Sequence, residues 1–139
     1  MAHVYKIGEA AARIGLTHRA LRYYEELGLL ENRQRNAGET RRYSDEDLIN
    51  IERIIELRDL LGFSLIEIKR IIESDRKIEK LKTEYFSDKG DKKAILTEAS
   101  DLISGQLKLI EKKVIKLRNM KHSLNVRLNR IEEELQALE

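Results

Sequence analysis

The residues with the clearest capacity for chemistry are arginines and tyrosines gathered near the start of the chain. Ten of the 14 arginines fall in residues 1–74, and residues 1–43 carry eight basic and five acidic side chains. Four of the five tyrosines lie among them: Tyr5, Tyr23, Tyr24 and Tyr43. Guanidinium groups bind phosphate in a bidentate manner, and tyrosine hydroxyls contact DNA phosphates. The pattern predicts an anion-binding surface, with a merely solvated charged face as the alternative.

Other kinds of chemistry are poorly represented. The 139 residues include no Cys, which excludes disulfides, thiolate metal sites and cysteine nucleophiles. The three histidines, at 3, 18 and 122, are too far apart in sequence to predict a metal site. Because no nucleophile motif or phosphate-binding glycine loop occurs, the sequence predicts neither an enzyme nor a cofactor.

The elements that must position the basic residues begin with two short helices. Apolar spacing predicts one helix over 7–14, a turn at Gly15-Leu16, and a second helix capped by Thr17 and reaching Leu27. In the second helix a predicted buried stripe (Ala20, Leu21, Tyr24 and Leu27) leaves four other side chains free to face a groove. Those four are His18, Arg19, Arg22 and Tyr23. This layout is that of a helix-turn-helix.

A basic hairpin and two more helices are predicted next. Residues 31–43 carry four Arg around Gly38 with no apolar periodicity, which favours a short hairpin, or wing. Ser44 and Asp47 form an acidic variant of the capping box at the start of a third helix, which runs to the break at Gly62. Ser64 and Glu67 form a second capping box, and a fourth helix is predicted to end at about Ser74.

The remainder of the chain is predicted to be a charged connector, 75–93, and a coiled coil, 94–139. In the connector the pair Tyr85-Phe86 is interpreted as a packing anchor, with a small hydrophobic effector site as the alternative. Beyond it every d position of six heptads is apolar, which predicts pairing with a second chain rather than a helical hairpin within one chain. Lys121 occupies an a position, where a buried charge restrains register or strand number. The predicted dimerisation residues are Ile103, Leu107, Ile110, Val114, Leu117 and Leu124.

The sequence therefore predicts a mainly α fold: a winged helix-turn-helix head over 1–74, followed by a connector and a long coiled-coil dimerisation helix. No apolar run approaches the ~18 residues that span a bilayer, and the N-terminus lacks a secretory layout. We expect a cytoplasmic protein without a membrane partner.

With these elements placed, the head resembles the MerR family of bacterial transcription regulators. The resemblance rests on YKIGEAA from Tyr5, on LRYYE from Leu21 followed by Gly28-Leu29-Leu30, and on RRYS from Arg41. A further match, LGFSLIEI, begins at Leu61. Together these motifs cover residues 5 to about 74, whereas the tail resembles the family in layout only.

The resemblance implies a homodimer on a two-fold-symmetric operator in double-stranded promoter DNA. It implies that the dimer bends and untwists the duplex, and so acts on RNA polymerase indirectly, through the promoter. Carried over by position, Arg19, Arg22 and Tyr23 match recognition-helix contacts, and Arg41 and Tyr43 match wing contacts to the DNA backbone. His18 lies beside them and completes the predicted DNA-binding set.

Two departures from the family pattern limit the choice of signal. The branches that sense metals, superoxide or aldehydes use cysteines, which this chain lacks. The drug-sensing branch adds a ligand domain after the coiled coil, and here the sequence stops at Glu139, so any small-molecule effector is left unidentified. The rival hypothesis, an architectural or recombination accessory protein, would use the same head to bend DNA.

Overall fold

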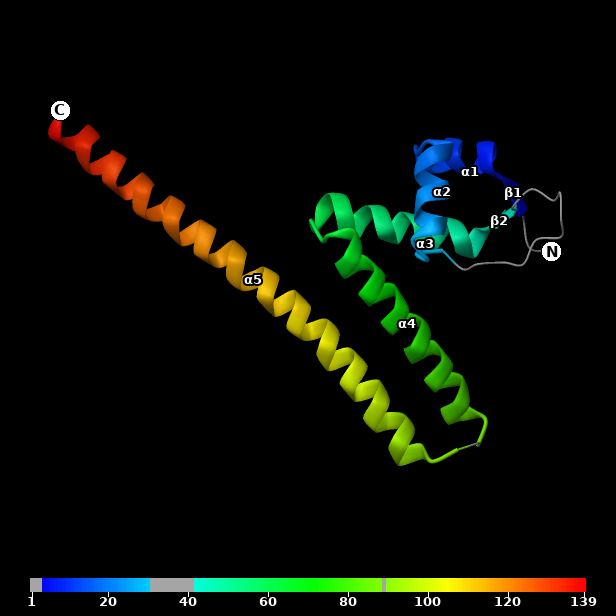
Figure 1. Cartoon of the computed structure of the whole chain (residues 1–139). Coiled ribbons are helices and arrows are strands. Elements are labelled where there is room, and N and C mark those ends of the chain that lie inside the picture. The colour runs from blue at the N-terminus through cyan, green and yellow to red at the C-terminus, as the bar shows by residue number, and fades with distance from the viewer. Residues whose placement is uncertain (1–3, 31–41, 89) are drawn as a thin grey trace. The chain divides into compact units, whose positions relative to one another are not determined.

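The computed structural model describes residues 4–30, 42–88 and 90–139. Contacts divide the chain into two compact units, Met1–Glu79 and Lys80–Glu139. The strands and α-helices, labelled in Figure 1, are β1 (Val4–Lys6), α1 (Ile7–Ile14), α2 (His18–Glu26), β2 (Arg42–Ser44), α3 (Asp45–Ile55), α4 (Leu65–Phe86) and α5 (Lys92–Ala137). A π-helical turn (Glu56–Leu60) follows α3.

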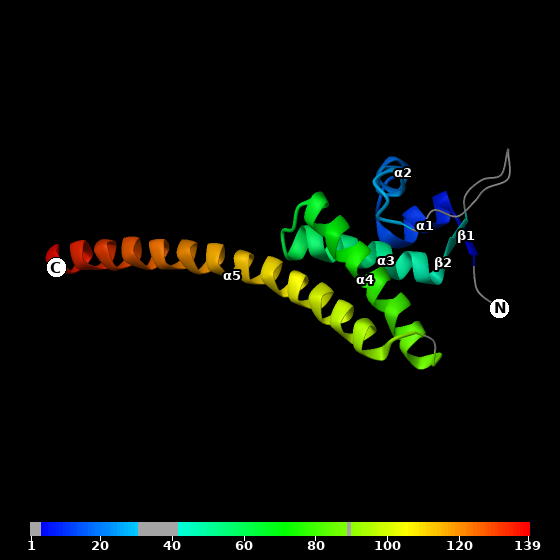
Figure 2. The same cartoon turned by 60° about the horizontal axis from the view of Figure 1, so that its bottom comes forward.

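A two-stranded antiparallel sheet joins the start of the first unit to the residues that precede α3. β1 pairs with β2 so that Tyr5 lies opposite Tyr43 and Lys6 lies opposite Arg42. Figure 2 shows the two strands side by side near the N-terminal ends of α1 and α3. Because side chains alternate along a strand, both tyrosines are buried while Lys6 and Arg42 are exposed. The sequence predicted no strand at 4–6.

Side-chain caps fix the starts of three helices of the first unit, α2, α3 and α4. The Thr17 hydroxyl accepts a hydrogen bond from the Ala20 amide at 3.1 Å, which caps α2. Ser44 and Asp47 bond each other's backbone amides at the start of α3. Ser64 and Glu67 do the same at the start of α4. All three predicted caps are therefore confirmed, and they fix where α2, α3 and α4 begin.

The first unit has a small core to which every element contributes. Leu21 and Tyr24 of α2 are buried, which confirms two positions of the predicted stripe, and Ile51 and Ile54 of α3 are fully buried. The remaining core side chains of this unit are Tyr5, Ala10, Ala11, Leu29, Leu30, Tyr43, Leu48, Leu57, Phe63, Ile68, Ile71 and Ile72. Each fully buried aliphatic side chain contributes roughly 1.5–3 kcal/mol. Helix α1 contacts both α2 and α3, so this core holds the three helices together.

The fourth helix is longer than predicted. We expected it to end near Ser74, yet α4 continues to Phe86, so most of the predicted connector, 75–93, is helical. The physical reason is that residues 75–86 contain no Gly or Pro and are rich in Lys and Glu, which favour helix. The expected loop shrinks to the few residues between α4 and α5.

The second unit consists of the end of α4 and α5. Asp91 caps α5 by accepting hydrogen bonds from the amides of Lys93 and Ala94. At the end of α4, Tyr85 and Phe86 meet edge to face with ring centroids 5.2 Å apart, and Phe86 stays exposed instead of packing as the expected anchor. Across the described residues, no helix is long and apolar enough to cross a membrane.

Candidate nucleic-acid interface

The predicted recognition helix exposes the side chains expected to face DNA. His18, Arg19, Arg22 and Tyr23 of α2 are all exposed, and Tyr23 retains 49% of its accessible surface. Their spacing, three or four residues apart, places them on neighbouring positions of the helix surface. His18, Arg19 and Arg22 lie in the N-terminal half of α2, where the helix dipole is positive and no acidic residue lies in the first turn. This face can attract phosphate.

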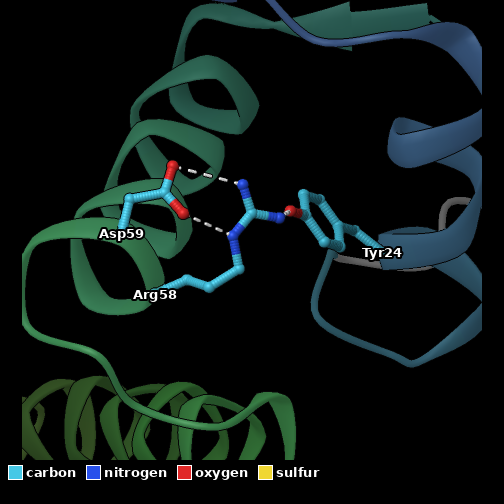
Figure 3. Close-up of polar contacts among 3 residues, drawn as sticks. All are labelled: Tyr24, Arg58 and Asp59. Carbon is cyan, nitrogen blue, oxygen red and sulfur yellow. Dashed lines mark hydrogen bonds and ion pairs between the residues drawn. The ribbon is translucent and has the colours of Figure 1, made fainter.

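The opposite, C-terminal half of α2 is attached to the rest of the unit. Figure 3 shows Arg58, from the π-helical turn, reaching across to Tyr24 of α2. Its guanidinium donates a hydrogen bond to the Tyr24 hydroxyl and lies over the ring, 5.6 Å from the centroid. A third contact joins strand and helix, because the Tyr43 hydroxyl donates to the Glu25 carboxylate at 3.4 Å.

Asp59 holds Arg58 in place for this contact. Two hydrogen bonds, of 2.7 and 3.3 Å, join the guanidinium to the two carboxylate oxygens. The hydrogen bond from Arg58 lowers the pKa of the Asp59 carboxyl below its ordinary value, and the same bond raises the pKa of Arg58. Both groups are therefore charged at neutral pH, and the guanidinium is oriented toward α2.

The expected role of Tyr43 needs correction. We predicted that it contacts the DNA backbone from the wing, but its side chain is 1% exposed and its hydroxyl is directed at Glu25. The cause is the strand alternation of β2, which turns Tyr43 into the core opposite Tyr5. Tyr43 joins the sheet to α2 through Glu25, so it helps to hold the predicted recognition helix in place without being exposed itself.

Arg41 lies outside the described residues, as does most of the predicted wing, 31–43. Its neighbour Arg42 is described, and it is exposed on β2 directly opposite Lys6 of β1. Two like charges placed opposite each other in a sheet repel unless an anion lies near both. The sequence analysis did not predict this pair. Its signal in the sequence is that the charged Arg42 directly precedes the aromatic Tyr43, so in a strand the two side chains lie on opposite faces.

The predicted dimerisation residues form an exposed row on α5. Ile103, Leu107 and Ile110 retain 48%, 52% and 46% of their surface in the single chain. Val114, Leu117 and Leu124 continue the row at 37%, 60% and 48%. Exposed apolar side chains at a and d spacing over several heptads are typical of a seam that pairs with another helix. The six side chains thus lie along one helix, α5, and are exposed in the single chain.

The site offers electrostatic and hydrogen-bonding groups for an anion. Within the described part of the chain, no three His, Asp or Glu side chains gather as metal ligands would. The exposed groups of α2 and the sheet are guanidinium, ammonium, imidazole and phenol donors, which suit phosphate oxygens and base edges.

Comparison with known proteins shows which family this chain is similar to. Residues 5–75 match the family model for the MerR HTH family regulatory protein. The HTH-type transcriptional regulator YfmP of Bacillus subtilis is 35% identical over 136 residues, which cover 96% of this chain and 97% of that protein. The ZntR homolog of Haemophilus influenzae, also an HTH-type transcriptional regulator, is 34% identical over 108 residues, covering 76% of this chain and 78% of that one.

A solved structure extends the similarity to nearly the whole fold. The crystal structure of HiNmlR, a MerR family regulator lacking the sensor domain and bound to promoter DNA, is 27% identical with a TM-score of 0.55. The alignment covers 96% of this chain and 88% of that one. The helix-turn-helix and the long C-terminal helix are thus both shared with solved regulators.

Proposed function

Because the chain belongs to the MerR family of helix-turn-helix transcription regulators, we propose that it controls a promoter by binding its DNA as a homodimer. The contacts to DNA come from His18, Arg19, Arg22 and Tyr23 on α2. The observation that carries this proposal is that these four side chains share an exposed face on a helix whose other end is anchored to the core. The promoter DNA bound by HiNmlR supports the same partner.

The strands and the segment before β2 add contacts to the DNA backbone. Arg41, carried over from the family resemblance, and the exposed Arg42 bring positive charge to this part of the head. Phosphate contacts of this kind set register and supply much of the affinity, while α2 reads the bases. Tyr43 takes no direct part in this proposal, because its side chain is buried.

The second copy pairs through the exposed row on α5. Burying six large aliphatic side chains against a twin stabilises the dimer by several kcal/mol even after the entropy of association. A dimer of this kind presents two copies of α2, which explains why a two-fold-symmetric operator is expected. It regulates by bending and untwisting the duplex, so RNA polymerase responds to the altered promoter.

The dimer is tested with a matched pair of substitutions on α5. Ile110 at a d position and Ile115 at an outward b position are similarly exposed, at 46% and 56%. We expect Ile110→Asp to convert the dimer to a monomer and to lower affinity for promoter DNA at least about 100-fold, because one head keeps only half the contacts. Ile115→Asp should change neither, as measured by light scattering and fluorescence anisotropy.

Two results would contradict the proposal. One is a wild-type chain that is monomeric when bound to DNA. The other is an equal loss of dimer in both variants, since the seam would then lie elsewhere on α5.

A further inference from the structure

Arg76 joins the helix α4 to the end of the recognition helix. It lies on α4, and its guanidinium donates one hydrogen bond to the Gly28 carbonyl at 3.2 Å and another to the Leu29 carbonyl at 3.1 Å. These carbonyls lie just past Leu27, the C-cap of α2, at the negative end of the helix dipole, which favours a cation. Because the guanidinium is a planar fork, both bonds fix its position.

The backbone that Arg76 holds is otherwise built as a rigid end to α2. Gly28 has φ of 77°, and the Leu29 amide donates to the Tyr24 carbonyl at 3.0 Å. Leu29 and Leu30 are 0% and 1% exposed. The chain then enters residues 31–41, so Arg76 binds the point between the two segments proposed to contact DNA.

The residue before Arg76 attaches α4 to a second helix. Asp75 forms an ion pair with Arg53 of α3 at 2.7 Å. Two successive residues of α4 therefore make long-range contacts: Asp75 with α3, and Arg76 with the backbone that follows α2. α4 is also the helix that continues past Glu79 into the second unit, which contains the proposed dimer seam.

We propose that Arg76 is a positioning residue that makes the orientation of α2 follow α4, and through it the dimer. The inference rests on the proposed DNA-binding function and deepens it. A shift of α4 by about 1 Å past α2 would stretch both hydrogen bonds beyond their working range. Either α2 moves with α4, or its C-terminal end is released. Arg76 itself touches no DNA; it sets how far the bound duplex is distorted.

The attachment itself is tested in the free protein by hydrogen exchange. Arg76→Gln removes the charge and shortens the side chain, while Arg70→Gln removes the same charge from an exposed arginine of α4 and is the matched control. We expect the amides of Leu27, Gly28 and Leu29 to exchange at least about tenfold faster in Arg76→Gln only. Arg76→Lys, which keeps the charge and can donate to one carbonyl at a time, should give an intermediate rate.

The effect on DNA is tested by energy transfer between dyes at the ends of a bound operator duplex, selected with the wild-type protein. Because α2 keeps its exposed contacts, Arg76→Gln should bind within about threefold of the wild type. It should bend the duplex less, while Arg70→Gln bends it as the wild type does. Arg76→Lys should restore part of the bend at unchanged affinity.

Several outcomes would overturn the inference: unchanged exchange at Leu27–Leu29, exchange accelerated equally across the first unit, or equal bending by both glutamine variants. A wild-type protein that selects no operator would count against the proposed function instead. In that case the exchange rates still decide whether Arg76 holds the end of α2.

Discussion

At the scale of single residues, the side chains proposed to touch DNA are distinct from those that hold the helix carrying them. Arg19 and Arg22 are exposed on α2, whereas the buried Tyr24 and Tyr43 and the partly exposed Arg58 attach the same helix to the rest of the unit. Helical spacing predicted this division for α2, because the apolar positions 21 and 24 mark the buried side. The long-range partners Arg58 and Arg76 could not be predicted, since arginines on exposed helix faces carry no sequence signal of a specific acceptor.

Arg22 is expected to act through phosphate charge. Arg22→Ala should weaken DNA binding and lower the slope of log affinity against log salt by about one. Arg130→Ala, at the outward c position of the α5 heptads, is the control and should leave the slope unchanged. Binding titrations at several salt concentrations measure both. A slope unaffected by Arg22→Ala would remove this residue from the phosphate contacts.

The facing cations Lys6 and Arg42 are expected to lower the stability of the free protein and to raise its affinity for DNA. Lys6→Ala relieves the repulsion across the sheet, so the free protein should gain roughly 0.2–1 kcal/mol in unfolding free energy. The same change should reduce DNA affinity, because it removes a positive charge opposite Arg42, which we propose contributes to binding the DNA backbone. Urea denaturation and binding titrations test the two signs. A variant that is less stable, or that binds DNA as well as the wild type, would contradict the role given to this pair.

At the scale of elements, capping residues predicted correctly where helices begin, whereas the strand pairing and the end of α4 were not predicted. Thr17, Ser44 and Ser64 predicted three caps that the structure confirms. The pairing of β1 with β2 was missed, because three-residue strands separated by almost forty residues leave no periodic pattern. The length of α4 was missed because most of residues 75–86 are charged and obscure a sparse apolar stripe, Ile78, Leu81 and Tyr85, of which Leu81 is buried.

Two glycines are expected to respond oppositely to the same substitution. Gly15 ends α1 with φ of 81° and has open space where a Cβ would lie, so Gly15→Ala should cost about 1 kcal/mol through backbone strain alone. Gly105 lies inside α5 with equally open surroundings, and Gly105→Ala should stabilise the protein by about 0.5–1 kcal/mol. Thermal unfolding at a fixed protein concentration measures both changes. A melting temperature that shifts in the same direction for the two variants would contradict the backbone conformations given to Gly15 and Gly105.

The coiled coil is expected to be limited by its charged a position. Lys121→Leu should raise the melting temperature of the proposed dimer, since it replaces a charge at a predicted seam position with an apolar side chain. Lys112→Leu, at the outward f position, is the matched control and should have little effect. Calorimetry and light scattering report stability and assembly. Equal behaviour of the two variants would mean that the seam ends before Lys121.

At the scale of the whole molecule, we propose that one unit contacts DNA and the other pairs with a second copy. The first unit carries the basic face of α2, and the second carries the apolar row of α5. α4 belongs to both, and Arg76 on it holds the end of α2. The fold class and this division could be predicted from charge and heptad spacing. The family resemblance named the promoter as target, but the operator sequence is not encoded in any residue pattern.

Selection of duplexes from a random-sequence pool tests whether the protein is a dimeric, sequence-specific regulator. Purified wild-type protein is mixed with the pool at near-physiological salt, where non-specific phosphate binding is weak, and the bound duplexes are sequenced. We predict enrichment of one inverted repeat whose half-sites keep a fixed spacing, because a dimer presents two copies of α2. Enriched sequences without two-fold symmetry, as an architectural protein would give, or no enrichment at all would contradict this function.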